Sequence, residues 1–400
     1  MQDWAPRTSS QGRRRRRTRL LWSVVAAAAA LALSACGSSS SSSSSAGSST
    51  SVGSAATSGG STSASTSSSA CLSQAKQVVD AAEQALTTEV PSQSIPMSKL
   101  KGKLVYFIGL GSGYSLRLAT DFEIAAHAAG LNPVIFNGAT PPDWNTGIQQ
   151  AVSRHAAGIM MMPIQPSLVQ PSLAQAKTAG IPVVNENSIP PAATGITTTV
   201  PVPTTIGKQI AAYAALENNC KVNAVIPLDP AFVGLVSIAD SMIAEFKQLC
   251  PSTCTGKTMP LNIATVATEA GPAIQSQLQK DPSINAVMPT FDSLALIMAP
   301  ALAQSGSKAK LYSLDGDEAN LALVRKGLQA ADYSYAPTNY QAYIDVDALA
   351  RTMLKMPSTP SPVQFQLFTT ANIPGSSSFE ALWPKLNGFQ SQFMKLWGLS

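Results

Sequence analysis

The stretch KLVYFIGLGSGYSLRLATDFEIAAHAAGLNPVIF, residues 103–136, contains the pattern that decides the fold of this 400-residue chain. Its first seven residues, 103–109, form an almost uninterrupted apolar run, which predicts a strand that is covered on both faces. Residues 115–129 then carry apolar side chains at helical spacing, and a second apolar run follows at 133–136. Strand, helix and strand in this order form the unit from which parallel sheets are built.

The same alternation continues to residue 184 and then begins again. The first set comprises predicted strands at 103–109, 133–136, 158–162 and 181–184, with helices at 115–129, 145–156 and 168–179. The second set comprises a helix at 205–219, strands at 222–227, 261–266, 284–288 and 310–313, and helices at 235–249, 271–280, from 293, and 318–326. A helix at 340–354, a strand at 363–367 and a helix at 384–397 follow. Two sets of similar length predict an α/β protein with two similar doubly wound parallel-sheet lobes.

The N-terminal residues have the order of an export signal. A block of arginines at 13–17 and 19 precedes an apolar run over 20–33, and the small residues Ser34 and Ala35 come directly before Cys36. This order predicts a signal peptide over 1–35 that is removed from the mature protein. The apolar run is also shorter than the ~20 residues that a membrane-spanning helix needs. Arg19 stands where a twin-arginine motif has an apolar residue, so the route of export stays open.

The residues around Cys36 resemble the lipobox of bacterial lipoproteins. The segment reads Leu33-Ser-Ala-Cys-Gly37, and the resemblance implies that Cys36 receives lipid and becomes the new N-terminus. It further implies an extracytoplasmic protein that is lipid-anchored to the outer face of the cell membrane. The alternative is an ordinary secretory signal that ends on a cysteine by chance.

Residues 37–70 are nearly all Ser, Gly, Ala and Thr, and they predict a disordered tether. A flexible chain of this length spans about 30 Å.

Removal of residues 1–35 takes away seven Arg and one Asp, which leaves 20 basic and 21 acidic residues. The formal net charge therefore falls from +5 to −1, and the basic character that would suggest a nucleic-acid partner belongs to the signal peptide.

Four cysteines remain after Cys36, and in an exported protein they predict two disulfides. Cys71, Cys220, Cys250 and Cys254 allow three pairings, and their spacing does not choose among them. A zinc site is the alternative. No histidine lies near any of the four, and their spacing matches no zinc finger, so we predict no metal.

The ordered series of patterns resembles type 1 periplasmic binding proteins of the ribose and sugar class, in their actinobacterial form. The segments that carry this resemblance are 130–136, 148–154, 157–160, 180–184, 281–287, 291–292, 313–316, 324–327 and 393–398. The resemblance covers about residues 100–398. It implies a monomer without cofactor or catalytic activity, which captures a solute between two lobes and delivers it to an ABC permease.

The resemblance also implies that the chain crosses between the lobes three times, near residues 203, 336 and 363. Lobe 1 would then comprise 100–203 plus 336–362, and lobe 2 would comprise 204–335 plus 363–400 with the C-terminal helix. Ahead of them we expect the signal peptide at 1–35, the lipidated Cys36 and tether at 36–70, and a helical extension at 71–99.

Ligands of open parallel sheets lie beyond the carboxyl ends of the strands, so the loops after the strands hold the candidate ligand-binding residues. These residues are Ser112, Tyr114, Trp144, Gln165, Asn187, Asp229, Phe232, Asp240, Phe291, Asp292, Asp315 and Tyr335. The resemblance implies a stacking role for Tyr114, a ligand-binding role for Asp292 and a hinge position for Tyr335. Trp144 is either a pocket wall or a packing residue at a helix start.

The candidate residues predict a neutral ligand. Members of the family often have an Asp-Arg pair after the fourth strand and an arginine on the first helix of lobe 2, where this chain has Asn187-Ser188 and Asp240. Without an arginine clamp, a carboxylate or phosphate ligand is disfavoured, and a sugar or polyol fits better. A nucleoside, an amino acid, or a sensory role that serves a membrane receptor are the alternatives.

The sequence offers little support for an enzyme. Gly109-Leu-Gly-Ser-Gly113 follows a strand as a dinucleotide-binding loop does, but its glycines are spaced G-x-G-x-G instead of G-x-G-x-x-G. The two histidines, His127 and His155, have no nucleophile or metal partner nearby in the sequence. We therefore predict no catalysis.

Overall fold

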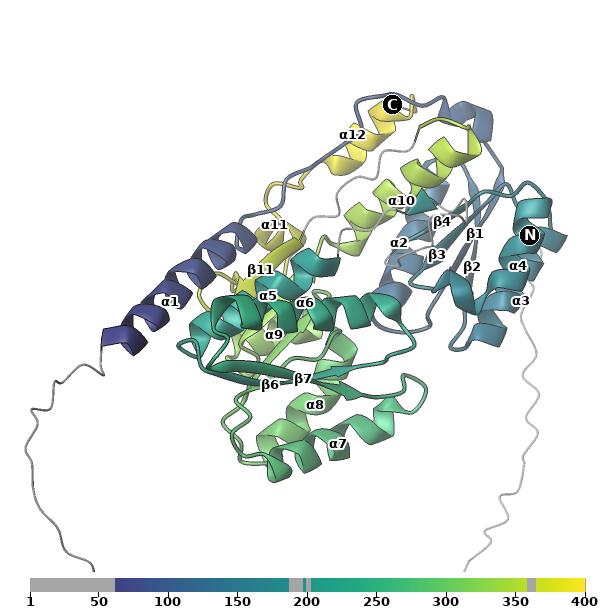
Figure 1. Ribbon diagram of the computed structural model, residues 1–400. Helices are drawn as coiled ribbons and strands as arrows, with labels where there is room; N and C mark the ends of the chain where they lie inside the picture. The colour runs from purple at the N-terminus through teal and green to yellow at the C-terminus, as the bar shows by residue number, and fades with distance from the viewer. Residues whose placement is uncertain (1–61, 187–196, 199–202, 358–364, 400) are drawn as a thin grey trace, which may run out of the picture. The chain divides into compact units, whose positions relative to one another are not determined.

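The computed structural model describes residues 62–186, 197–198, 203–357 and 365–399 (Figure 1). The predicted signal peptide, Cys36, the first part of the tether and Asn187 lie outside the described residues. None of the helices that are described has the length and apolar character required to cross a membrane.

Sheet 1 consists of five parallel strands in the order β2-β1-β3-β4-β5. The strands are β1 (Leu104–Gly109), β2 (Asn132–Asn137), β3 (Gly158–Met162), β4 (Val183–Asn185) and β5 (Thr197–Thr198). Alternate side chains of these strands pack on opposite faces. Phe107 and Met160 share a core with α2 (Gly113–Ala128), whereas Ile108 and Met161 share a core with α3 (Pro141–Ser153) and α4 (Gln170–Thr178). Burial on both faces explains why these strands are continuous apolar runs.

Sheet 2 has six strands in the order β11-β10-β9-β8-β6-β7, of which only β11 is antiparallel to its neighbour. The strands are β6 (Val222–Leu228), β7 (Cys254–Pro260), β8 (Ala286–Val287), β9 (Lys310–Leu314), β10 (Ala331–Tyr335) and β11 (Phe365–Thr369). One face carries α5 (Pro203–Glu217) and α6 (Val233–Leu249), and the other carries α7 (Val266–Lys280) and α8 (Asp292–Gln304), with α9 (Glu318–Arg325) between β9 and β10. The predicted class, two doubly wound parallel-sheet units, is confirmed.

Two strands of sheet 2 differ from the prediction. The strand predicted at 261–266 is wrong, because the sheet pairs residues 254–260 instead and 261–265 form the loop before α7. As the last strand of the sheet, β7 has only Cys254 and Met259 buried and so lacks an apolar run. Strand β10 was not predicted, because Asp332 and Ser334 interrupt its apolar residues although all five residues are buried.

The helix that follows sheet 2 returns to sheet 1. Helix α10 (Thr338–Met353) comes directly after β10, yet it packs against α2, β3 and β4 of sheet 1. The C-terminal α12 (Phe389–Leu396), which follows the short α11 (Phe379–Leu382), lies beside α10 (Figure 1). The rings of Tyr343 and Trp397 stack at 5.4 Å, and Trp397 Nε1 donates a hydrogen bond to Asp347 Oδ1 at 3.0 Å.

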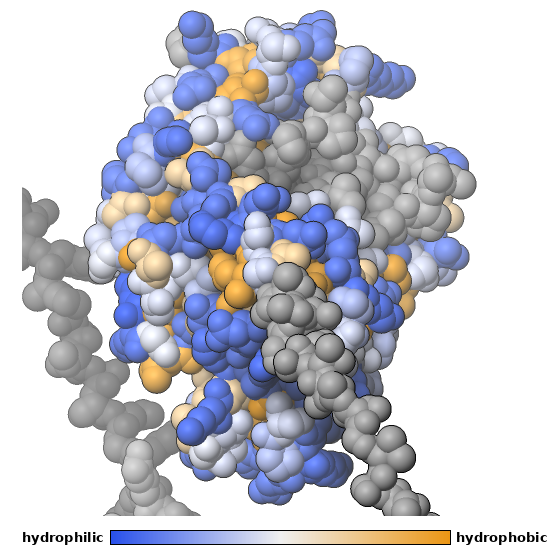
Figure 2. Space-filling view, turned by 60° about the vertical axis from the view of Figure 1, so that its left-hand side comes forward, coloured by the Kyte–Doolittle hydropathy of each residue, from blue (hydrophilic) through white to orange (hydrophobic). Residues whose placement is uncertain are grey.

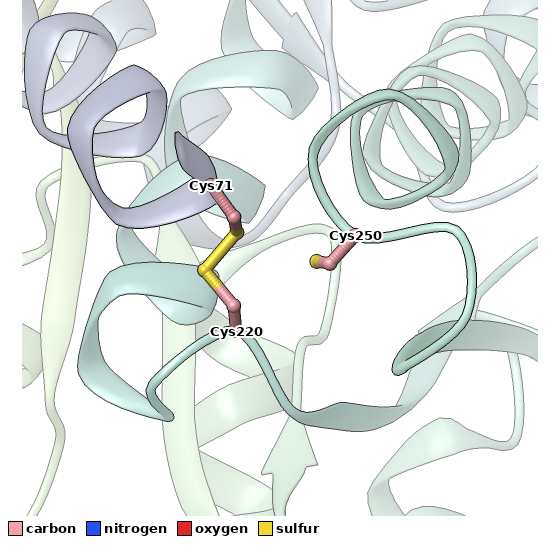
Figure 3. A group of neighbouring side chains, drawn as sticks. All are labelled: Cys71, Cys220 and Cys250. Atoms are coloured by element: carbon pink, nitrogen blue, oxygen red, sulfur yellow. A yellow bond between two sulfur atoms is a disulfide. The ribbon is translucent and has the colours of Figure 1, made fainter. Parts of the chain in front are cut away.

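The N-terminal α1 (Thr62–Ala82) packs against α5 and is joined to the sheet 2 core by a disulfide. It begins inside the segment that was expected to be a disordered tether, since residues 61–90 contain no glycine or proline to end a helix. Cys71 is bonded to Cys220, directly before β6, and Cys250 is bonded to Cys254. The sulfurs of Cys71, Cys220 and Cys250 lie within 4.8 Å of one another (Figure 3). Because all four are disulfide-bonded, the described residues offer no free thiolate for the zinc alternative.

The surface has the mixed character of a protein whose apolar side chains are mostly internal. On the face shown in Figure 2, hydrophobic residues form small separate groups among hydrophilic ones. Leu116, Ile124, Val233 and Leu328 are the large apolar side chains that are exposed among the described residues. Scattered exposure of this kind is ordinary for a folded protein.

The two disulfides should contribute unequally to stability. They span sequence separations of 149 and 4 residues, so the double variant Cys71→Ser/Cys220→Ser should lose about 5 kcal/mol and Cys250→Ser/Cys254→Ser about 2 kcal/mol. Urea unfolding of both variants, with disulfide mapping of the parent protein, measures the difference. A larger loss in the second variant would contradict the assigned role of Cys71 in fixing α1.

Candidate functional site

A cavity of about 90 Å³ lies where the carboxyl ends of strands from both sheets meet. Its lining residues come from the loops after β1, β3, β6, β7, β8 and β9, the starts of α2, α6 and α8, and the end of β10: Leu110, Ser112, Gly113, Tyr114, Ser115, Met162, Pro163, Gln165, Phe232, Val233, Gly234, Leu235, Ile263, Thr290, Phe291, Ser293, Leu314, Asp315 and Tyr335. The cavity thus occupies the position that open α/β sheets offer to ligands.

The start of α2 brings Tyr114 against sheet 2. Gly113 has φ +55°, and a Cβ added there would lie 3.5 Å from Ser293 Oγ at the start of α8, so glycine permits both the turn and this approach. Tyr114 Oη donates to the Ala336 carbonyl at 3.4 Å. The Tyr114 ring lies 5.2 Å from the ring of Tyr335, which ends β10. Residues that are distant in the sequence therefore form one aromatic wall of the cavity.

The turn after β9 presents Asp315 to the cavity in a strained conformation. Asp315 has φ 135°, which non-glycine residues rarely adopt. Gly316 follows with φ +77°, and a Cβ there would lie 2.8 Å from the Cβ of Ser334. Strain of this kind persists only where the surrounding structure enforces it, and it is frequent at ligand sites.

Buried carboxyl groups at the start of α8 and in β10 hold that turn in place. Asp292 is fully buried and accepts hydrogen bonds from the hydroxyl of Ser313 and from the backbone N–H of Asp317, the latter at 2.7 Å. Asp332 Oδ1 accepts from the backbone N–H of Gly316 at 3.1 Å. The backbone N–H groups of two consecutive residues of the turn are therefore bound to buried carboxyls.

Burial is the main cause of the altered acidity in this network. It raises the pKa of Asp292 well above its usual value, and the neighbouring carboxyls of Asp332, Asp315 and Asp317 raise the pKa further. Burial also raises the pKa of Asp315 well above its usual value, with Asp317 as the next cause. The network therefore favours protonated carboxyls, which donate as well as accept hydrogen bonds.

One arginine joins the two sides of the cavity at its edge. Arg117 of α2 forms an ion pair with Asp317, and its guanidinium lies 5.6 Å from the centre of the Tyr114 ring. The Arg117 side chain is 40% exposed and does not line the cavity. Its charge is directed to a protein carboxylate, so it is no arginine clamp for an anionic ligand.

Seven of the predicted ligand-binding residues line the cavity: Ser112, Tyr114, Gln165, Phe232, Phe291, Asp315 and Tyr335. Asp292 does not line it, because its carboxyl takes part in the buried network. Asp240 is exposed on α6, away from the lining. Asn187 lies outside the described residues.

Two further predicted residues have structural contacts behind the lining. Asp229 accepts hydrogen bonds from the backbone N–H groups of Ala231 and Ile263, both at 2.8 Å, and so ties two loops together. Trp144 is buried, donates to the Gly138 carbonyl at 2.7 Å, and meets the ring of Phe232 edge-on at 6.4 Å. Of the two interpretations of Trp144, packing at a helix start describes these contacts.

Val233, Ile263, Thr290 and Ser293 also line the cavity but were not predicted. Ile263 had been placed in a strand that does not form, and the apolar Val233 carries no signal for a polar ligand site. Thr290 and Ser293 flank Phe291, which was predicted, so their place directly after β8 was the available signal.

The described lining contains hydroxyls, one amide, one carboxyl and several aromatic and aliphatic side chains, but no lysine, arginine or histidine. The starts of α2, α6 and α8 add backbone N–H donors of first helical turns. Such a set can hydrogen-bond and stack against a small uncharged molecule. Neither His127 nor His155 reaches it.

Comparison with known proteins identifies one family and many solved structures. The model of the periplasmic binding protein domain family matches residues 107–354. No curated protein matches the sequence significantly.

The similar solved structures share the fold at low sequence identity. A 5-methylthioribose transporter solute-binding protein from Thermotoga lettingae, in complex with 5-methylthioribose, has a TM-score of 0.65 at 16% identity, covering 73% of this chain and 98% of its own. A carbohydrate transporter from Acidothermus cellulolyticus, in complex with myo-inositol, has a TM-score of 0.60 at 20% identity, covering 73% and 99%. An ABC transporter solute-binding protein from Agrobacterium vitis with bound allitol has a TM-score of 0.61 at 20% identity, covering 68% and 96%.

The buried Asp292 should give the protein a measurable pH dependence of stability. Its raised pKa means that the folded state holds the proton more tightly than the unfolded chain, where the pKa is about 3.9. Its contribution to the free energy of unfolding should therefore fall as pH rises above about 4. Asp292→Asn cannot ionise, so its stability relative to the parent protein should increase between pH 4 and pH 7, as measured by urea unfolding.

The exposed Asp240→Asn provides the matched control and should keep the pH profile of the parent protein. If the profiles of Asp292→Asn and the parent run parallel, Asp292 does not titrate differently in the folded state.

Proposed function

Because the chain belongs to the periplasmic binding protein domain family, we propose that it is an extracytoplasmic solute-binding protein of an ABC importer. It captures a small neutral polar ligand, a sugar or polyol, and delivers it to the permease. The observation that carries this proposal is the cavity itself, which takes its lining from the strand ends of both sheets. A solute bound there contacts both sides at once, so its binding favours the closed arrangement.

The two sides of the cavity act as the two lobes. Lobe 1 comprises 100–203 plus 336–362, and lobe 2 comprises 204–335 plus 363–400, with α12 lying on α10. The turn between β10 and α10 is one of the three connections, and Tyr335 and Ala336 lie at it. Tyr114 contacts both of these residues. The aromatic wall that Tyr114 and Tyr335 form therefore lies at a connection that moves when the two lobes close.

The ligand class follows from the charges of the lining. Asp315 is the one ionisable carboxyl of the described lining, and no cationic side chain accompanies it. A ligand carboxylate or phosphate would therefore be buried next to a carboxyl without a compensating charge. Hydroxyl groups can donate to Asp315 and accept from backbone N–H groups, and the solved structures with allitol and myo-inositol contain ligands of this kind.

The protein acts at the outer face of the cell membrane. Removal of residues 1–35 and lipidation of Cys36 anchor it there, and the remaining Ser-rich residues link the anchor to α1. Since Cys71 is bonded to Cys220, the anchor is attached to lobe 2. The protein works as a monomer without cofactor, nucleic acid or catalytic step.

A thermal-shift screen of the purified protein against sugars, polyols, nucleosides and amino acids tests the proposal. A ligand that binds only the folded state adds about 2.7 kcal/mol of stability at one hundred times its Kd, so the unfolding midpoint should rise with a sugar or polyol. A shift with nucleosides or amino acids alone would keep the capture function and change the ligand class. No shift with any compound would contradict solute capture.

The variant Asp315→Asn tests whether the ligand binds in the cavity. Asparagine keeps the size of the side chain and tolerates positive φ, but it replaces one carboxyl oxygen with an amide nitrogen, which cannot accept a hydrogen bond. We expect affinity for the ligand from the screen to fall by about three- to tenfold, the value of a hydrogen bond between neutral groups, in calorimetric titration. Asp240→Asn should bind as the parent protein does, and unchanged affinity of Asp315→Asn would locate the ligand elsewhere.

A further inference from the structure

Most hydrogen-bonding side chains of the cavity already have partners within the protein. The hydroxyl of Tyr114 donates to the Ala336 carbonyl at 3.4 Å, and that of Thr290 donates to the Pro227 carbonyl at 3.3 Å. Ser115 Oγ donates to the Met162 carbonyl at 3.1 Å and accepts from the Leu110 N–H at 2.9 Å. These hydroxyl protons are directed into the protein and not into the cavity.

The side chains left for a ligand are few and lie together. The hydroxyls of Ser112 and Ser293 make no hydrogen bond with any part of the chain that the structure describes, and they flank the contact between Gly113 and α8. Asp315 offers one more acceptor, because only its Oδ2 is bound, by the N–H of Asp292 at 3.3 Å. Two hydroxyls and one carboxyl oxygen therefore form a compact polar end of the cavity.

The remaining wall on the sheet 2 side is apolar. Val233 and Leu235 of α6, with Ile263 from the loop after β7, line the cavity without a polar side chain among them. Val233 is 44% exposed, although most valines of the core are buried. A ligand that covers this wall would remove its methyl groups from water.

A fully hydroxylated sugar does not match a cavity with one polar end and one apolar wall. Each ligand hydroxyl placed against the apolar wall would lose its water, and the side chains of that wall offer no hydrogen bond to replace it. An alkyl or aryl group in the same position gains about fourfold in affinity for each methylene that it buries.

We infer that the ligand is a neutral polyol or sugar that carries an aliphatic or aromatic substituent. The substituent lies against Val233, Leu235 and Ile263, and the hydroxyl groups meet Ser112, Ser293 and Asp315. This inference rests on the proposed capture of a sugar-like solute and adds the chemical feature by which the protein selects among such solutes.

Matched pairs of probes test the inference by calorimetric titration of the purified protein. The pairs are D-glucose with phenyl and n-butyl β-D-glucosides, D-ribose with its benzyl glycoside, and myo-inositol with its mono-O-methyl ether. We expect at least one substituted member to bind ten times more tightly than its parent. Parents that bind as tightly as their derivatives, or more tightly, would overturn the inference and leave the proposed function standing. No binding by any member of any pair, or by any sugar in the wider screen, would overturn both.

The variant Ile263→Thr tests the assigned wall directly. Threonine keeps the branch at Cβ but replaces the ethyl group of isoleucine with a hydroxyl, and the backbone of this residue stays fixed by Asp229. We expect the preference for the substituted probe to fall at least threefold while the affinity for the unsubstituted parent stays within twofold. The control is Ile124→Thr, the same change on α2 at a side chain that is 60% exposed and outside the lining. Equal preferences in the two variants would overturn the assigned wall.

Discussion

The buried carboxyl of Asp292 is the interaction on which the geometry of the candidate site depends. It lies at the first residue of α8, accepts from the Asp317 N–H and from Ser313, and so joins the loops after β8 and β9. Burying a carboxyl is unfavourable, and the raised pKa of Asp292 reflects that cost. The network offsets it with hydrogen bonds, and in return the turn holds Asp315 in a backbone conformation that an isolated peptide would avoid.

The same turn connects the network to the opposite side of the cavity. Asp317, whose N–H is bound to Asp292, forms the ion pair with Arg117 of α2. Arg117 in turn lies over the ring of Tyr114, which contacts Tyr335 at the end of β10. An ion pair with a partly exposed partner contributes little to stability. Its position matters more, because it links the start of α2 to the strained turn across the cavity.

Most of the fold was predictable because the strands of both sheets are covered on two faces. Gly158–Met162 is buried at every position, and a strand in that environment must be apolar throughout, so its sequence is distinctive. Strands that are exposed, or that bury polar side chains, lack this apolar pattern and were not predicted. The edge strand β7 is mostly exposed, and β10 carries Asp332 and Ser334 because their side chains satisfy the buried network. The apolar residues 261–266 resembled a strand, although Ile263 faces the cavity from a loop.

The sequence by itself determined the alternation of strands and helices, the division into two sets, and most of the loops that line the cavity. These properties depend on local periodicity and on burial, and both are visible in the residue pattern of each segment alone. Only the tertiary structure decided which loop residues face the cavity, the pairing of Cys71 with Cys220, and the place of α12 on α10. Such choices depend on contacts between residues far apart in the chain, and no single segment contains the information that selects one contact over another.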